Sequence, residues 1–137
     1  MEVIVCLDDR GGMTFNGRRQ SRDRCVCEDI IKNMPNCQKL LISEYSRALF
    51  DDYDVTTVCT EGFLEIAVVD DICFVENRAL LPYLDNIKRI TIYKWNRHYP
   101  SDMTFDIELE NSGFKLFTTD EFEGYSHEKI TKEIYVK

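Results

Sequence analysis

Histidine is scarce in this chain, and the scarcity limits the metal chemistry that the chain can support. Only two of its 137 residues are histidines, His98 and His127, and they lie far apart in the sequence. Six cysteines are present, but Cys25 and Cys27 have the wrong spacing for a redox pair, and no second close pair completes a zinc site. We therefore predict no metal site, and free thiols in a reducing compartment, with a secreted disulfide framework as the alternative.

Long apolar runs and an excess of positive charge are also missing. No stretch approaches the length of a membrane span, and residues 1–20 lack the charged-then-apolar pattern of a signal peptide. We therefore expect a cytoplasmic protein with no membrane partner. The formal net charge of −8 argues against general nucleic-acid binding, which requires a basic surface. Without repeats, linkers or low-complexity segments, residues 1–137 are expected to form a single domain.

The positive charge that is present gathers near the start of the chain. An apolar run at residues 3–7 predicts a strand buried on both faces, and the following segment carries Gly11-Gly12 and the turn signal Asn16-Gly17. Four arginines then occupy seven positions: Arg18, Arg19, Arg22 and Arg24. Guanidinium groups match the geometry of phosphates and carboxylates, so the cluster is a candidate anion site. A solvated arginine face at the start of a helix is the alternative.

Apolar periodicity and turn residues predict the remaining elements. The expected helices follow strands in alternation, at about residues 22–34 with Ser21 as the cap, from Ser43 to residue 50, from Thr60 to residue 67, and at 78–85. The expected strands are residues 38–43, 55–58, 72–75, 88–95, 103–109, 114–118 and 129–136.

This order of elements predicts a three-layer α/β fold. Alternating strands and helices imply a mainly parallel sheet with flanking helices, and the all-β last third implies antiparallel strands added at one edge. Sheets of this kind bind ligands beyond the carboxyl ends of their parallel strands, where the arginine segment is expected to lie.

At this level of detail the chain resembles the dihydrofolate reductase family over nearly its full length. After the first strand, the family's glycine-bearing pattern ending in Asn-Gly-Arg is matched by Asp9, Gly11, Gly12, Met13, Asn16, Gly17 and Arg18. The last strands follow the family in order and spacing: NIKRITIYKW, YPSDMTFDIEL, GFKLFTTDEF and YSHEKITKEIYV. The resemblance implies a dihydrofolate reductase-like fold.

The departures from that family lie in its functional motifs. The family's substrate-lining Pro-Trp is replaced by Arg19-Gln20-Ser21, and its helix carboxylate has no exact counterpart, Asp23 being close. The Gly-Arg-x-Thr-Trp turn that holds cofactor phosphates reads Ser43-Glu44-Tyr45-Ser46-Arg47, and the Gly-Gly pair beside the pyrophosphate reads Val75-Glu76-Asn77. A carboxylate where a phosphate would approach is unfavourable, so no cofactor is predicted.

These observations favour a binding protein on the family's scaffold rather than a working dihydrofolate reductase. Its expected partner is a small anionic ligand, nucleotide-like or phosphorylated. The expected contacts lie on the arginine segment and on the loop that the family layout places beside it: Arg18, Arg19, Arg22, Trp95, Arg97 and His98. Trp95 could equally pack on a neighbouring helix, and His98 could be an ordinary surface residue.

Three alternatives stay open in the sequence. The first is a reductase with an altered NADPH site, in which Asp23 donates a proton and the segment from Asp9 to Arg24 acts as a lid. The second is a ribonuclease, since short chains resembling this one are sometimes labelled ribonuclease Z. Two histidines cannot supply that enzyme's zinc cluster, so only a metal-independent ribonuclease that uses His98 or His127 with the arginines stays open. The third is a homo-oligomer paired through edge strands at 103–109 and 129–136, against which charges such as Glu108 protect.

Overall fold

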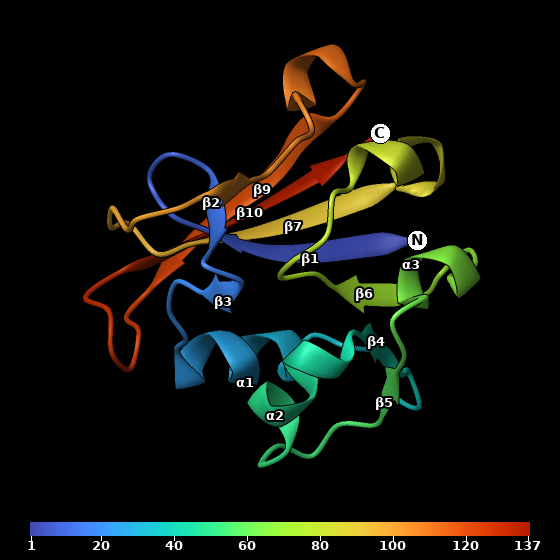
Figure 1. Cartoon of the computed structure of the whole chain (residues 1–137), viewed down its shortest axis with the longest axis horizontal. Helices are drawn as coiled ribbons and strands as arrows, with labels where there is room; N and C mark the ends of the chain where they lie inside the picture. Colours follow the sequence, from blue (N-terminus) through green and yellow to red (C-terminus); the bar gives the residue numbers. More distant parts are fainter.

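The computed structural model describes every residue from Met1 to Lys137. A seven-stranded sheet with the order β5-β4-β6-β1-β7-β10-β9 runs through the molecule (Figure 1). Five of its strands are parallel: β1 (Glu2–Leu7), β4 (Leu40–Ile42), β5 (Thr57–Cys59), β6 (Ile72–Phe74) and β7 (Arg89–Lys94). Two antiparallel strands extend the sheet beyond β7, namely β10 (Ile130–Val136) and then β9 (Lys115–Phe122). The predicted mixed sheet is confirmed.

Strand β1 lies in the middle of this sheet, between β6 and β7. Its successive side chains point to opposite faces, and both faces are covered: Val3 and Val5 are fully buried in one apolar cluster, and Ile4 is buried in the other. A strand with no solvent face needs no polar alternation, which is why its sequence is one continuous apolar run.

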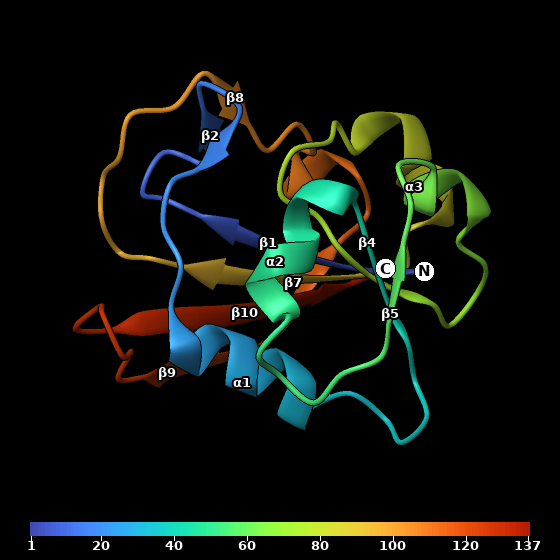
Figure 2. The ribbon, with the colours of Figure 1, turned by 60° about the horizontal axis from the view of Figure 1, so that its bottom comes forward.

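Helices cover the two faces and complete three layers. On the Ile4 face lie α1 (Arg24–Lys32) and the short α2 (Arg47–Phe50), which follows a 3₁₀ turn at Glu44–Ser46 (Figure 2). On the other face lie α3 (Phe63–Ile66) and a 3₁₀ helix at Leu81–Asn86. None of these helices is long and apolar enough to span a bilayer.

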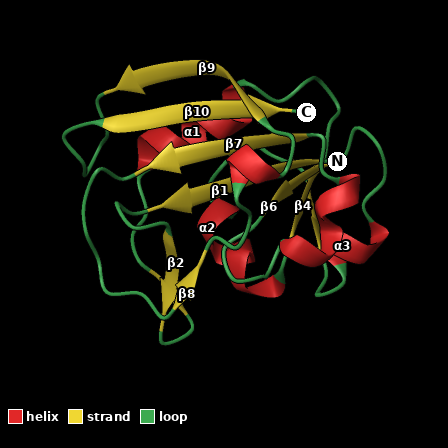
Figure 3. Ribbon diagram, turned by 90° about the horizontal axis from the view of Figure 1, so that it is seen from above, coloured by secondary structure: helices red, strands yellow, loops and turns green.

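A second, three-stranded sheet is built beyond the carboxyl end of β1 (Figure 3). It comprises β2 (Gly12–Phe15), β3 (Arg18–Arg19) and β8 (Met103–Thr104). Asn16 and Gly17 form the predicted turn between β2 and β3, with φ of 51° and 73° as a two-residue hairpin turn requires. Arg18 and Arg19 therefore lie in a hairpin, whereas Arg22 lies in the irregular segment that follows and Arg24 begins α1.

Several predicted elements differ from the structure. Helix α1 begins at Arg24 and is capped by Asp23, not Ser21, because the Asp23 carboxylate accepts the Cys25 backbone N–H. The helices expected after Thr60 and at 78–85 shrink to one α-helical turn and a 3₁₀ helix, since so short a crossover has room for little more. The strand expected over 103–109 is two residues long and pairs with β2, outside the main sheet.

The edge of the sheet also differs from the prediction. Residues 129–136 were expected to expose an edge, but β10 is hydrogen-bonded on one side to β7 and on the other to β9. On this side of the sheet the edge strand is β9, which is almost entirely exposed. It carries Lys115 at its start and Asp120 and Glu121 near its end, charges of the kind that discourage pairing of exposed edges.

Candidate functional site

Four segments meet at the carboxyl ends of β1, β6 and β7. They are the segment from β1 through β3 to α1, the residues after β6, the loop after β7, and the turn between β9 and β10. Three buried or nearly buried carboxylates, Asp8, Glu76 and Asp23, join these segments, each to a different neighbour. Together they fix the shape of the crevice at this end of the sheet.

Asp8 stabilises the turn after β1 and links it to the loop after β7. Its carboxylate accepts the backbone N–H groups of Gly12 at 2.7 Å, Arg10 at 2.9 Å and Tyr99 at 3.1 Å, and the Gln20 amide at 3.0 Å. Although burial alone would raise the pKa of Asp8, these hydrogen bonds outweigh it, so the pKa lies below its ordinary value. The carboxylate is therefore ionised and fully engaged in holding the turn.

Gly12 is required at this point by close packing. A Cβ atom there would lie 2.5 Å from the Gln20 side-chain nitrogen and 2.7 Å from the Ser101 Cβ. Met13, the next residue, is 5% exposed and belongs to the core. Of the expected lid residues, Asp9, Asn16, Gly17 and Gly11 are at the surface or half-exposed, whereas Gly12 and Met13 are packed.

Glu76 ties the hairpin to the end of β6. Its carboxylate receives two hydrogen bonds from the Arg19 guanidinium, at 2.7 and 3.0 Å, and one from the Ser46 hydroxyl at 2.8 Å. The Arg19 guanidinium also lies 4.5 Å from the centre of the Tyr45 ring, and the Tyr45 hydroxyl accepts the Arg19 backbone N–H. The bond to Glu76 is the main reason why the pKa of Arg19 is raised.

Beneath this ion pair the crevice is nearly filled. It is lined by Arg19, Ser21, Glu76 and Trp95 among others, and its volume is about 20 Å³, which is room for roughly one water molecule. Two thiols, Cys6 and Cys27, also line it. Burial raises the pKa of Cys6 well above its ordinary value and that of Cys27 to about 11, so both stay protonated near neutral pH and are poor nucleophiles.

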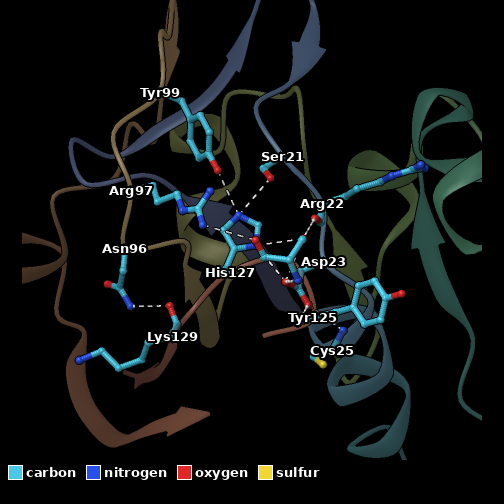
Figure 4. A network of polar contacts seen from close by, with 11 residues as sticks. Ser21, Arg22, Asp23, Cys25, Asn96, Arg97, Tyr99, Tyr125, His127 and Lys129 are labelled. Atoms are coloured by element: carbon cyan, nitrogen blue, oxygen red, sulfur yellow. Dashed lines mark hydrogen bonds and ion pairs between the residues drawn. The ribbon is translucent and has the colours of Figure 1, made fainter. Parts of the chain in front are cut away.

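Asp23 directly precedes α1, and its carboxylate is bonded to the turn between β9 and β10 (Figure 4). Its carboxylate accepts the backbone N–H groups of Tyr125 at 2.9 Å and Ser126 at 2.8 Å, besides that of Cys25. Gly124 makes this approach feasible, because a Cβ atom at that position would lie 2.7 Å from an Asp23 carboxylate oxygen. The turn is thus wrapped around the Asp23 carboxylate.

The same carboxylate holds His127. The Asp23 Oδ2 atom lies 2.9 Å from His127 Nδ1, and both side chains are almost completely buried. Burial alone would raise the pKa of Asp23, but the hydrogen bonds from Tyr125, His127 and Ser126 hold it far below its ordinary value. Because an ionised carboxylate only accepts, Nδ1 carries the proton in this contact. The group is arranged to orient His127 rather than to donate a proton.

The other side of the imidazole meets two hydroxyl groups. His127 Nε2 lies 3.1 Å from Ser21 Oγ and 3.1 Å from the Tyr99 hydroxyl oxygen (Figure 4). In the neutral ring Nε2 accepts these protons. Trp95 stacks on the imidazole with ring centres 4.7 Å apart and an interplanar angle of 21°, so the ring is held from its face as well as from both nitrogens.

The structure brings only some of the expected ligand contacts together. Arg18 and Arg19 line a surface cleft of about 480 Å³ together with Phe15, Tyr99 and Pro100. Arg22 lines a second cleft of about 500 Å³ beside Tyr53 and Tyr125, and it also borders the small crevice that Arg19 and Trp95 line. Trp95 is 4% exposed, while Arg97 and His98 are exposed on the loop after β7.

Sequence reasoning did not single out His127, Ser21, Tyr99, Asp8 or Glu76 as parts of one constellation. His127 lies 104 residues from Asp23, and no spacing pattern connects positions so distant. The only available signal was the topology. Parallel strands followed by antiparallel strands bring the segment before α1 and the turn before β10 to the same end of the sheet. No group of three or more His, Cys, Asp and Glu side chains is arranged to hold a metal ion.

The comparisons with known proteins agree with this architecture. No protein-family model matches the chain, and no curated protein matches it in sequence. A solved structure does match: dihydrofolate reductase from Enterococcus faecalis, complexed with NADP(H) and RAB-propyl, is 10% identical with a TM-score of 0.65. The match covers 98% of this chain and 94% of that one. The chain therefore has the dihydrofolate reductase-like fold over nearly its whole length, as its sequence predicted.

Proposed function

We propose that this protein binds a small anionic ligand, nucleotide-like or phosphorylated, in the cleft beside Arg18, rather than reducing dihydrofolate. The cleft of about 480 Å³ is within the usual range of small-molecule sites. Its wall offers the Arg18 guanidinium, the Gln20 amide and the aromatic rings of Phe15 and Tyr99, and no acidic side chain lines it. Arg19 also lines it, but its guanidinium is already paired with Glu76. This combination suits a charged group joined to a ring.

The observation that carries the proposal is the distribution of unpaired arginines. The chain has nine arginines, and four of them pair with carboxylates, at positions 19, 47, 78 and 89. The remaining five have no carboxylate oxygen within 4 Å, and all lie in the segment from Arg10 to Arg24 or on the loop after β7: Arg10, Arg18, Arg22, Arg24 and Arg97. Unpaired arginines gathered at one end of an acidic protein provide a local attraction for anions.

The residues at the end of β6 argue against the reductase alternative. A dinucleotide phosphate brought there would meet the Glu76 carboxylate, which already accepts from Arg19 and Ser46. The crevice beneath has room for roughly one water molecule. These residues do not fit the NADPH cofactor, and no reductive step is derived from them.

Calorimetric titration with pyrophosphate, AMP and NADPH in separate arms tests the proposal. We expect saturable binding of pyrophosphate or AMP that weakens with added salt, because exposed charges are screened. Arg18→Ala should weaken this binding at least about tenfold, since a charge-assisted hydrogen bond contributes about 1.5–3 kcal/mol. Arg47→Ala is the matched control, since Arg47 is exposed and lies on α2, away from the cleft, and it should leave affinity unchanged.

Two outcomes would contradict the proposal. One is the absence of saturable binding in the pyrophosphate and AMP arms. The other is equal affinity of wild type and Arg18→Ala. Tight binding in the NADPH arm that survives Arg18→Ala would restore the reductase alternative, because the cofactor would then be held by residues other than this cleft.

A further inference from the structure

One chemical feature of the crevice plays no part in ligand binding at Arg18: Asp23, His127 and Ser21 are connected in series. The Asp23 carboxylate lies 2.9 Å from His127 Nδ1, and His127 Nε2 lies 3.1 Å from Ser21 Oγ. Both distances are those of a hydroxyl nucleophile, its general base and the carboxylate that orients the base. The three residues come from two segments that are distant in the chain, so no local sequence preference brings them together.

The imidazole is held as a general base must be. Its Nδ1 proton is committed to Asp23, which leaves the Nε2 lone pair directed at the hydroxyl groups. Trp95 stacks on its face, and His127 is 4% exposed, so the ring is fixed in orientation and shielded from water. A fixed base next to a hydroxyl group needs little reorganisation to accept its proton.

Two hydroxyl groups, those of Ser21 and Tyr99, lie next to His127 Nε2, and the neighbouring backbone N–H groups distinguish them as candidate nucleophiles. The N–H of Arg22, the residue directly after Ser21, has no acceptor in the protein. The N–H of Tyr99 is already bonded to Asp8. In serine hydrolases the N–H after the nucleophile helps to stabilise the oxyanion of the tetrahedral intermediate. The residue after Ser21 therefore has an uncommitted N–H donor, whereas the N–H of Tyr99 itself is already committed to Asp8.

We propose that Ser21 is a nucleophile that accepts a short acyl group from an oxygen ester, with His127 as general base and Asp23 as the residue that positions it. Ser21 Oγ attacks the carbonyl carbon, its proton passes to His127 Nε2, and that proton then leaves with the departing alcohol as the ester C–O bond breaks. A water molecule releases the acid by the same route in reverse order, which regenerates the Ser21 hydroxyl. The proposal is independent of the Arg18 cleft.

The crevice limits the size of the substrate. Ser21 lines a space of about 20 Å³, which holds roughly one water molecule, so its wall must move to admit even a short acyl chain, and the alcohol part stays in solvent. The ion pair between Arg19 and Glu76 forms part of the same wall, and its opening would admit more. We therefore expect Glu76→Ala to acylate faster than wild type with the same small ester.

The test uses p-nitrophenyl acetate and a small alkyl fluorophosphonate with the full chain. We expect a stoichiometric burst of nitrophenolate, and a single covalent adduct that peptide mass spectrometry places on Ser21. The fluorophosphonate reaction forms a bond from Ser21 Oγ to phosphorus and releases fluoride and the serine proton. Ser21→Ala removes one hydroxyl and should abolish both reactions, while His127→Gln should slow them by about 100-fold or more. Ser112→Ala, at a half-buried serine in a distant turn, should react as wild type.

A second measurement separates positioning by Asp23 from a purely structural role. In wild type, nitrogen NMR of the His127 ring should show the proton on Nδ1. Asp23→Asn can still accept the helix N–H groups but does not hold that tautomer, so the Nδ1 proton signal should be lost together with the burst. An adduct on Tyr99, a cysteine or His127 itself would overturn the proposal, as would labelling of Ser21→Ala at the wild-type rate or the absence of any adduct on Ser21 in folded protein.

Discussion

Charged side chains are paired in the interior of the crevice and unpaired at its rim. In the interior, Asp8, Asp23 and Glu76 each accept three or more hydrogen bonds from the segments around them. At the rim, five arginines have no carboxylate partner. A buried charge must find a partner within the protein when the chain folds, whereas an exposed charge is solvated by water and stays available to a ligand. The contrast indicates that the carboxylates hold the fold together and that the arginines are free to act on something else.

Removing the Asp23 carboxylate should be the largest disturbance. Asp23→Ala leaves His127 and three backbone N–H groups without their acceptor and removes the cap of α1, so we expect the free energy of unfolding to fall by about 3–5 kcal/mol. Urea denaturation followed by circular dichroism measures it. Arg18→Ala at the rim should change the same quantity by less than about 0.5 kcal/mol. Similar losses in the two variants would refute the contrast between interior and rim.

Glu76→Gln should have an intermediate effect. The substitution keeps the shape of the side chain but removes the charge that Arg19 and Ser46 contact, and the Arg19 side chain is about one-fifth exposed, so part of the loss is screened. We expect destabilisation by about 1.5–3 kcal/mol in the same urea assay. Glu44→Gln, which removes a surface pair with Arg47 at 3.7 Å, provides the control and should cost less than about 0.5 kcal/mol. An equal cost for both would mean that Glu76 is not a structural tie.

Acidification should have the smallest effect of the three, because it removes the stability contributed by the buried carboxylates only gradually. The pKa values of Asp8 and Asp23 are lowered in the folded state, so the stability that they contribute is complete above the unfolded Asp pKa of about 3.9 and is lost as the pH falls toward their folded values. Urea midpoints should therefore be flat from about pH 7 to pH 5 and decline progressively below about pH 4. Asp23→Asn should flatten this decline; an unchanged profile in the variant would show that Asp23 is not its source.

The sequence was sufficient for those parts of the fold that rest on local patterns. The apolar run of β1, the Asn16-Gly17 turn and the alternation of strand and helix each follow from residues that are close in the chain. Short crossovers were harder, because α3 and the segment at Leu81–Asn86 owe their extent to the sheet that they cover rather than to helix propensity. The two-residue β8 is likewise defined by its partner β2, since so short a segment has no pattern of its own.

The candidate site divides in the same manner. The sequence by itself determined that arginines gather after the first strand, that Glu76 stands where the family carries glycine, and that histidine is too scarce for a metal cluster. Only the tertiary structure decided that Arg19 is bound to Glu76, that Trp95 is stacked on His127, and that the Asp23 carboxylate is bonded to that histidine. The physical reason is distance along the chain: these contacts join residues 32 to 104 positions apart, and such pairs are selected by how the sheet brings its ends together.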